Sequence, residues 1–270
     1  MITDAAIEAH NAEAAAVWNA GGAAYEDLSR WVADAIEHVL TRLAPQAGER
    51  ILDVGTGTGW TARRVAQHGA NVTGIDFAAD MIAAARRLAA AQHLDVDWRV
   101  ADAEKLPFAN GEFDAVVSTF GVMFVARPGR AARELARVCR TGGRLGLLAW
   151  WPDGNMLEMF NVMKPYMSAP VVPAPSPFEW GRPERVRELL GGEFDLSLEL
   201  GTSQLHLTDG ETAWRMLATG YGPIASLAAR LEPSRREALR HDLIDFFEGF
   251  RTRLGITMPR QYLVALGTRR

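Results

Sequence analysis

The chain has 270 residues, 48% of them hydrophobic and 23% charged, and its formal net charge is −4. This composition is typical of a globular protein with one closed core, and it excludes a disordered chain. The basic residues form nothing longer than pairs such as Arg63-Arg64, so we expect no nucleic acid partner.

The sequence carries no signal for export, membrane insertion or disulfide formation. Its first residues, MITDAAIEAH, include neither a basic region nor an apolar run, and no segment approaches the roughly 18 apolar residues of a membrane span. Cys139 is the single cysteine, and we expect it to be a buried small residue on a helix. These features predict a cytoplasmic protein with no membrane span, in a reducing compartment.

Residues 1–44 are expected to form a helical arm. Apolar residues recur at helical spacing over 31–43, and a proline follows that run. An earlier helix over 12–19 is broken by Gly21-Gly22. The arm should therefore consist of two helices with a flexible joint.

From residue 50 to residue 150, short apolar strands alternate with helices. Short buried strands separated by helices are typical of a parallel sheet that is covered on both faces. The last helix of this region should stop at Gly142-Gly143. We expect strands over 51–54, 71–76, 96–100, 113–118 and 144–150, and helices over about 60–66, 79–91 and 131–139.

The regular alternation ends at residue 151. Prolines crowd residues 151–183 and disfavour long helices and central strands, so we expect an irregular loop region that wraps an opening. Further along we expect a short helix, a long strand, a broken helical insert and a last strand, over 183–190, 194–207, 211–255 and 261–267.

A glycine-rich loop follows the first predicted strand, in the order Asp53-Val54-Gly55-Thr56-Gly57-Thr58-Gly59. Its glycines permit positive φ and a close approach of ligand to backbone, and the next helix begins with unpaired N–H groups. Such a loop binds a nucleotide-like ligand. A dinucleotide fingerprint would need glycine at position 60, where this chain has Trp60.

Asp53 lies two positions before the first glycine of the loop. A carboxylate in that place would repel a pyrophosphate and attract a cationic amine. S-adenosylmethionine carries an α-amino group and a sulfonium and has no phosphate, so Asp53 favours it over NAD. Alternatively, Asp53 could stabilise the turn through hydrogen bonds to its own backbone.

Two further acids follow strands where a nucleoside ligand would need them. Asp76 ends the second strand, where a carboxylate can accept both ribose hydroxyls, although it could instead cap the helix that begins near residue 79. Phe77 and Met81 would then flank the adenine. Asp102 follows the third strand and can accept the adenine amino group, although Asp is common in turns of any function.

Residues 48–151 resemble the class I S-adenosylmethionine-dependent methyltransferases, especially the branch similar to ubiquinone and menaquinone biosynthesis methyltransferases. The resemblance rests on the segments ILDVGTGTGW, VTGIDFAADM, VADAEKLPF, FDAVVSTFGVMF and ELARVCRTGGRLGLLAW. It implies an α/β, Rossmann-like sheet of seven mostly parallel strands. The last strand of that fold is antiparallel and is inserted between the fifth and the sixth.

The resemblance also implies a single domain over 1–270, with S-adenosylmethionine as the cofactor. Residues 1–44 would be a helical lid, 45–150 the cofactor-binding core, 151–258 the substrate side and 259–270 the last strand. Together with two aromatic residues of the arm, the expected cofactor residues are Asp53, Gly55, Thr56, Gly57, Gly59, Asp76, Phe77, Met81, Asp102, Ala103, Ser118, Thr119, Phe120, Tyr25 and Trp18.

Methyl transfer from a sulfonium is an in-line displacement, so the protein mainly positions the nucleophile and excludes water. A hydroxyl acceptor would in addition need a general base. No single base is favoured, since a histidine on a strand or helix can simply face solvent. The candidate catalytic residues are His206, His10, Tyr25, Asp209 and His241.

The acceptor is expected at the carboxyl ends of the strands, where the arm and the helical insert meet. Aromatic and methionine side chains near these segments suit a small, apolar or aromatic molecule. Trp18 and Tyr25 flank the Gly21-Gly22 joint, which predicts a lid that closes over the cofactor. The expected acceptor residues are Met123, Phe124, Trp150, Trp151, Trp180 and Tyr221.

Two other functions stay open at this point. An NAD-dependent oxidoreductase could use a similar sheet, but Trp60 and Asp53 count against it. A non-catalytic S-adenosylmethionine binder that acts as a regulator or scaffold is also compatible, because methyl transfer requires no obligatory catalytic side chain. No metal site is expected, and the chain could be a monomer or a homodimer.

Overall fold

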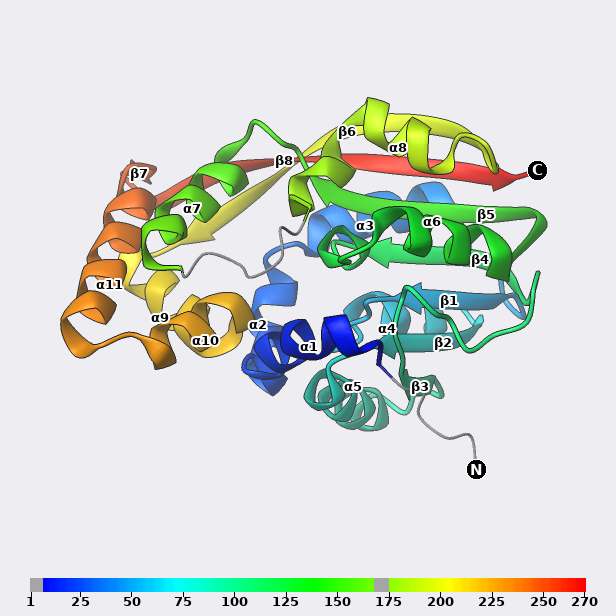
Figure 1. Cartoon of the computed structure of the whole chain (residues 1–270), viewed down its shortest axis with the longest axis horizontal. Helices are drawn as coiled ribbons and strands as arrows, with labels where there is room; N and C mark the ends of the chain where they lie inside the picture. Colours follow the sequence, from blue (N-terminus) through cyan, green and yellow to red (C-terminus); the bar gives the residue numbers. More distant parts are fainter. Residues whose placement is uncertain (1–6, 168–174) are drawn as a thin grey trace.

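One eight-stranded sheet forms the centre of the computed structural model, which describes residues 7–167 and 175–270 (Figure 1). The strand order is β3-β2-β1-β4-β5-β8-β6, with the short β7 paired to β8. Neighbours among β1 to β5 are parallel, whereas β8 is antiparallel to both β5 and β6. The predicted α/β sheet with an inserted antiparallel last strand is confirmed. The strands are β1 (Arg50–Val54), β2 (Asn71–Asp76), β3 (Asp97–Val100), β4 (Phe113–Thr119), β5 (Cys139–Trp150), β6 (Phe194–Leu207), β7 (Arg251–Thr252) and β8 (Gly255–Arg269).

Helices cover both faces of the sheet because its central strands are apolar on both sides. On one face α3 (Ala33–Leu43) packs against β5, β6 and β8. On the other face α6 (Pro128–Val138) and α8 (Pro183–Leu190) lie side by side (Figure 1). The crossovers between the first three strands are α4 (Trp60–Ala66) and α5 (Ala79–Ala91).

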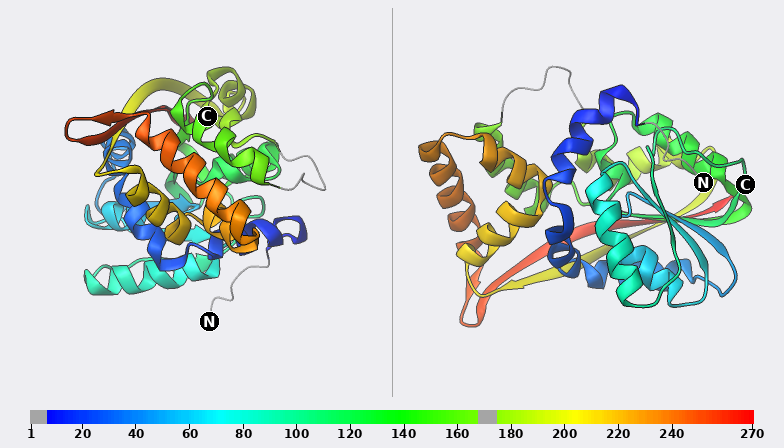
Figure 2. Two further views of the ribbon diagram at one scale, coloured as in Figure 1. Left: turned by 90° about the vertical axis from the view of Figure 1, so that its left-hand side faces the viewer. Right: turned by 90° about the horizontal axis from the view of Figure 1, so that it is seen from below.

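The N-terminal arm lies across the carboxyl ends of the parallel strands (Figure 1). It consists of η1 (Ala9–Asn11), α1 (Ala12–Asn19), η2 (Gly22–Ala24) and α2 (Tyr25–Arg30), and α3 follows. The predicted joint at Gly21-Gly22 separates α1 from η2. Figure 2 shows the arm between α5 on one side and the late helices on the other.

A second hydrophobic core lies beyond the end of the sheet. The antiparallel pair of β6 and β8 extends past its neighbours, and α7 (Asn155–Met163), α9 (Gly210–Gly220), α10 (Gly222–Arg230) and α11 (Pro233–Glu248) pack around it (Figures 1 and 2). Amphipathic helices must bury their apolar faces, and the protruding pair of strands offers the surface for it. Buried residues of this core include Met159, Leu205, Trp214, Leu239, Phe247 and Met258.

Three expectations about local structure are wrong. The segment expected to be an irregular loop contains α7, because Met159 and Met163 recur at helical spacing between two prolines and are buried. Gly142-Gly143 was expected to stop the helix predicted over 131–139, but that helix ends at Val138 and both glycines lie inside β5. Cys139 is buried as expected but is the first residue of β5, where pairing with β4 outweighs the local helical pattern.

The last strand is also longer than expected, since β8 begins at Gly255. Pro170 and Pro173 of the proline-rich segment, and residues 1–6 of the arm, lie outside the described residues. Within the described ranges, no helix combines the length and the apolar character that crossing a membrane requires. No group of three or more potential metal ligands is found among those same residues.

Candidate cofactor and acceptor site

A cavity opens at the carboxyl ends of the parallel strands, beneath the N-terminal arm. We call it the donor cavity. Its lining comes from the arm, the glycine loop and the segments that follow β2, β3 and β4. All the predicted cofactor residues line it except Asp53, Gly59 and Ser118. The glycine loop and the segments that follow β2, β3 and β4 were grouped by their motifs alone, and the fold brings them together in space.

The glycine loop between β1 and α4 forms one wall of the donor cavity. Its backbone has positive φ at Gly55 (68°), Gly57 (56°) and Gly59 (83°), a conformation that residues with side chains disfavour. The Thr56 N–H donates to the Ile75 carbonyl at 2.8 Å, which fixes the loop against the end of β2. The loop thus presents its backbone to the cavity in one defined shape.

The three glycines are needed for different reasons. A Cβ on Gly55 would lie 2.8 Å from Gly121 Cα, and one on Gly59 would lie 2.3 Å from the Trp98 ring. These two positions therefore permit close packing inside the protein. A Cβ on Gly57 would lie 3.4 Å from its nearest neighbour and would stand in the wall of the cavity. Gly57 is the position where a side chain would meet a ligand.

Asp76 ends β2 and is held in a fixed orientation by backbone donors. Its Oδ2 accepts the Gly57 N–H and its Oδ1 accepts the Ala78 N–H, both at 2.9 Å. Burial raises the pKa of Asp76 to about 6. The side chain also lines the donor cavity. A carboxylate held in this way can accept hydrogen bonds from the hydroxyls of a ribose.

Asp53 and Ser118 support the site from inside the protein. The Thr56 hydroxyl donates to Asp53 Oδ2 at 2.5 Å, and burial raises the pKa of Asp53 to about 7. Ser118 donates its hydroxyl to the Val54 carbonyl at 2.5 Å. Because Asp53 is fully buried and does not line the cavity, the structure places it where it stabilises the loop. The sequence analysis expected the Asp53 carboxylate to attract a cationic amine of the ligand. The position of Asp53 outside the cavity lining does not support that role.

Asp102, the residue expected at the adenine, is bound by the N-terminal arm. Its Oδ2 accepts the Glu8 N–H at 3.1 Å and the Asn11 side-chain amide at 2.9 Å. Its Oδ1 accepts the Glu104 N–H at 2.9 Å. The carboxylate therefore lies both in the cavity wall and at the point where the arm is attached.

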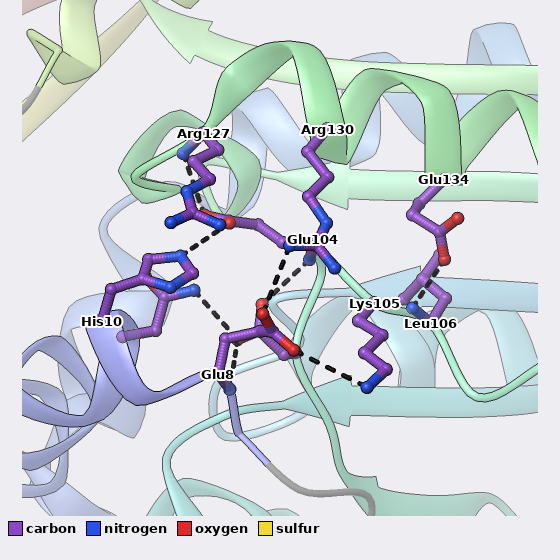
Figure 3. Close-up of polar contacts among 10 residues, drawn as sticks. Glu8, His10, Glu104, Lys105, Leu106, Arg127, Arg130 and Glu134 are labelled. Carbon is purple, nitrogen blue, oxygen red and sulfur yellow. Dashed lines mark hydrogen bonds and ion pairs between the residues drawn. The ribbon is translucent and has the colours of Figure 1, made fainter.

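The start of the arm makes further charged contacts next to Asp102 (Figure 3). His10 Nε2 lies 2.8 Å from Glu104 Oε2. Glu8 forms ion pairs with Arg130 at 3.2 Å and Lys105 at 3.7 Å. These contacts join the arm to the loop after β3 and to α6, so that the arm closes one side of the donor cavity.

A buried ion pair attaches α2 to α4, and a hydrogen bond attaches α2 to the glycine loop. Glu26 accepts from Arg63 at 2.7 Å and from the Thr58 hydroxyl at 2.8 Å. Only 5% of the Arg63 side chain and 12% of the Glu26 side chain are exposed, so water screens this pair little. The pair holds the neighbouring Tyr25 ring over Gly57.

A second cavity adjoins the donor cavity on the side of the helical insert. We call it the acceptor cavity. The two share one wall, which consists of Trp18, Tyr25, Val32, Phe120 and Phe124. The remaining lining comes from the arm, from the ends of β5 and β6, from β8, from α7 and from the helices of the insert, and it is almost entirely apolar or aromatic.

The shared wall is built from interlocking rings. Trp18 makes edge-to-face contacts with Tyr25, Phe124 and Tyr221, at centroid distances of 5.8, 4.9 and 5.5 Å. Phe120 stacks on Trp150 with centroids 4.0 Å apart. Phe120 has a φ of 59°, which is rare for a bulky residue. Strained backbone conformations of this kind cluster at functional sites.

The predicted acceptor residues divide into two groups. Phe124, Trp150 and Tyr221 line the acceptor cavity. Met123 and Trp180 are buried in the main core, and Trp151 lies just beyond β5; these three line neither cavity. An aromatic residue near a strand end can face either the core or the opening, and the sequence does not distinguish the two.

The predicted histidine and aspartate bases lie outside both cavities. His10 is bound to Glu104, as described above. His206 is exposed on β6 and His241 is exposed on α11. Asp209 is the N-cap of α9 and accepts a backbone N–H of its first turn at 2.7 Å. None of these groups faces a molecule held in either cavity.

Tyr25 is the one predicted catalytic candidate that lines both cavities. Burial and the nearby charge of Asp76 raise the pKa of Tyr25 to about 12. Its hydroxyl is therefore protonated at neutral pH. Tyr25 can donate a hydrogen bond but does not act there as a general base.

Comparisons with known proteins show which family the residues of the donor cavity belong to. Residues 52–147 match the family model described as a methyltransferase domain. The uncharacterized protein Rv1405c of Mycobacterium tuberculosis is 34% identical over 186 residues, which cover 68% of each chain. The demethylmenaquinone methyltransferase of Thermus thermophilus is 44% identical over 125 residues, or 46% of this chain and 55% of that protein.

The chain belongs to the class I S-adenosylmethionine-dependent methyltransferases. Another relative, Rv1403c of Mycobacterium tuberculosis, is 45% identical over 144 residues, so the match spans 53% of this chain and about half (52%) of that protein. Among solved structures, the YcgJ protein of Bacillus subtilis shares 19% identity with a TM-score of 0.60, over 88% of this chain and 98% of that one. At that identity the likeness shows the fold.

The matched methyltransferase domain contains the glycine loop and the acids of the donor cavity, and it ends before most of the acceptor cavity. Several residues that line this second cavity were not predicted as site residues, and among them Arg260 on β8 is the charged one. A signal for it exists: Met258, Arg260 and Tyr262 share one face of the strand, and all three are buried. Every second residue of this part of the strand faces the core, where apolar side chains are expected. An arginine at such a position is not explained by apolar packing and therefore indicates a special role.

Proposed function

We propose that this methyltransferase transfers the methyl group of S-adenosylmethionine to a small, largely apolar or aromatic molecule. The observation that carries the proposal is the pair of adjoining cavities with a common aromatic wall. One cavity has the loop and the acids that suit a nucleoside, and the other has an apolar lining that suits a small acceptor.

The residues of the donor cavity fit S-adenosylmethionine. Asp76 is oriented by two backbone N–H groups so that its carboxylate is free to accept ribose hydroxyls. Phe77 and Met81 line the same part of the cavity and would flank the adenine. Gly57 lets the ligand approach the backbone. A pyrophosphate would have no basic residue to meet, since no Lys or Arg is among the residues that line this cavity in the described structure.

S-adenosylmethionine would supply a sulfonium whose C–S bond breaks with its electron pair left on sulfur, while a lone pair of the acceptor forms the new bond to the methyl carbon. The protein's part is to hold the acceptor in line and to exclude water. Trp18, Tyr25 and Phe124 meet where the two cavities join, so they can position the reacting atom. No residue of the shared wall is a base at neutral pH, so an acceptor N–H or O–H would lose its proton to solvent either before it binds or after the methylated product is released.

The test is to incubate the protein with S-adenosylmethionine labelled in its methyl group and a panel of small phenols, amines, quinones and acids. We expect label in at least one small acceptor and formation of an equal amount of S-adenosylhomocysteine. Titration with S-adenosylhomocysteine and with NAD should give binding of the first and none of the second. Tight binding of NAD instead would contradict the proposal.

An inert complex would also contradict it. If S-adenosylmethionine binds but no member of the panel, and no macromolecule in a cell extract, becomes labelled, the protein is a binder rather than an enzyme. Label found only in a macromolecular acceptor would overturn the small-molecule part of the proposal.

A further inference from the structure

Two arginines in the described part of the chain are buried, and their surroundings differ. Arg63 is 4% exposed and forms the ion pair with Glu26. Arg260 is 2% exposed and has no carboxylate within ion-pair distance. A buried guanidinium without a counter-charge costs several kcal/mol unless something else compensates it.

The contacts of Arg260 use only part of its guanidinium. Nη2 donates to the Trp31 carbonyl and, at 2.7 Å, to the Ser203 hydroxyl. Nε is buried and has no hydrogen-bond partner within the described residues. The nearest acid, Asp34, is reached only through Ser203, whose hydroxyl lies 2.7 Å from Asp34 Oδ1. A purely structural role would account for the Nη2 bonds and would leave Nε unexplained.

Arg260 lines the acceptor cavity, and the Trp31 carbonyl to which it donates directly precedes Val32 of the shared wall. Among the described residues that line this cavity it alone carries a charge, and it does not line the donor cavity. Its guanidinium carbon lies 5.6 Å from the centre of the Trp150 ring, and Trp150 in turn stacks on Phe120 in the shared wall. Two stacked rings therefore connect the charge to the shared wall.

We propose that the acceptor of this methyltransferase is an apolar or aromatic carboxylate whose anionic group is bound by Arg260. This inference rests on the proposed function and names its substrate class. A carboxylate can accept from the planar guanidinium in a bidentate manner and supplies the missing counter-charge in a site from which water is excluded. The apolar lining encloses the rest of the molecule.

Binding at Arg260 also restricts the atom that is methylated. With its carboxylate bound by Arg260, the acceptor would present another group, such as a hydroxyl or an amine, to the methyl donor, and the bound carboxylate would stay unmethylated.

The test compares small carboxylates with their neutral amides, pair by pair, in the presence of S-adenosylhomocysteine. Suitable pairs are benzoate with benzamide and 4-hydroxybenzoate with 4-hydroxybenzamide, measured by calorimetry and as methyl acceptors. We expect carboxylates to bind at least about tenfold more tightly than the matched amides. Equal binding of the two, or no binding of any carboxylate at millimolar concentration, would overturn the inference.

Two variants separate the charge from the packing. Arg260→Met keeps the length of the side chain and should abolish the preference for carboxylates while leaving the affinity for S-adenosylhomocysteine unchanged. Arg269→Met removes the same charge from the same strand, outside both cavities, where Arg269 pairs with Glu193 at 2.7 Å. It should leave the preference intact.

If Arg260→Met does not fold, Arg260→Lys retains the charge without the planar fork and should weaken the preference. A carboxylate preference that survives unchanged in either Arg260 variant would contradict the proposal. Failure of S-adenosylhomocysteine to bind the unaltered protein would instead refute the proposed function, so the two failures are distinguishable.

Discussion

The two cavities of this methyltransferase are built in different ways. The donor cavity is formed mainly by loops that follow consecutive parallel strands, and its specific contacts come from backbone N–H groups and the acids that they orient. The acceptor cavity is formed by side chains from the arm, β5, β6, β8 and the late helices. The N-terminal arm is the one element that contributes heavily to both.

This difference matters for how each specificity can change. Backbone contacts in a loop of fixed shape tolerate few substitutions, since the positive φ angles require glycine. Side chains on separate elements can be exchanged one at a time without disturbing the loop. The family could thus keep one methyl donor while its acceptors diverge. The predictions below test whether the two cavities are separable in this way.

The largest effect is expected from Asp76→Ala. This change removes the carboxylate proposed to accept the ribose hydroxyls and leaves the Gly57 and Ala78 N–H groups without this partner. The affinity for S-adenosylhomocysteine should fall by about 100-fold or more, corresponding to roughly 3 kcal/mol. Asp80→Ala, an equal loss of charge on the exposed first turn of α5, should change the affinity less than about twofold. Calorimetric titration measures both, and an equal effect of the two variants would show that charge alone matters.

A second large effect is expected where the arm meets the glycine loop. Glu26→Ala leaves Arg63 buried without a partner and should cost about 3 kcal/mol of unfolding free energy. It should also weaken S-adenosylhomocysteine binding, since Tyr25 would no longer be held over Gly57. Glu37→Ala breaks the neighbouring pair with Arg64, whose side chains are 45% and 36% exposed, and should cost less than about 1 kcal/mol.

Urea denaturation and titration of the same samples check this pair of variants. If Glu26→Ala lowers stability but leaves ligand affinity unchanged, the arm is a structural support and not part of the donor cavity. The lid that the sequence predicts would then have no role in closing over the cofactor.

Most residues predicted for the donor side line one cavity, because their sequence signals are short and contiguous. Gly57, Asp76 and Asp102 each lie at the end of a strand or within a few residues after it. A correct order of parallel strands therefore places them at the same edge of the sheet. Asp53 shows the limit of that reasoning. Its type and spacing are those of a ligand contact, yet the hydroxyl of Thr56 holds it under the loop.

The acceptor side was harder because its residues come together only through the tertiary fold. Trp150 and Trp151 are adjacent in sequence, but strand alternation turns only Trp150 into the cavity. Arg260 was missed because the last strand was expected over 261–267, whereas β8 already begins at Gly255. The helix α7 lay within a stretch whose prolines suggested a loop, although the residues between Pro152 and Pro165 contain none.

An intermediate effect on the donor cavity should follow from Gly57→Ala. At Gly57 (φ 56°) a Cβ would be 3.4 Å from its nearest neighbour, and at Gly111 (φ 64°) it would be 3.6 Å away. The two alanine variants should therefore lose similar stability, about 1 kcal/mol each. Only Gly57→Ala should weaken S-adenosylhomocysteine binding, by about tenfold, because Gly111 lies in a turn outside both cavities. Equal affinities of the two variants would remove Gly57 from the binding surface.

The smallest predicted effect is a pH dependence that has opposite signs for stability and for binding. Burial raises the pKa of Asp76 to about 6 and that of Asp53 to about 7, so the folded protein holds these protons more tightly than the unfolded chain does. Stability linked to these acids is present below about pH 4 and is lost as the pH rises through 6 to 7, because unfolding then releases protons.

Ligand affinity should change in the other direction, since ribose hydroxyls donate to the ionised Asp76. With a pKa near 6, the affinity at pH 5.5 should be about fourfold lower than at pH 7. The acceptor cavity has no acid in its described lining, so carboxylate binding to the complex with S-adenosylhomocysteine should vary little over the same range. Asp76→Asn should flatten the profile for S-adenosylhomocysteine and leave the acceptor profile as it is. A profile that stays steep in this variant would assign the titration to another group and would remove Asp76 as the residue that makes the donor cavity sensitive to pH.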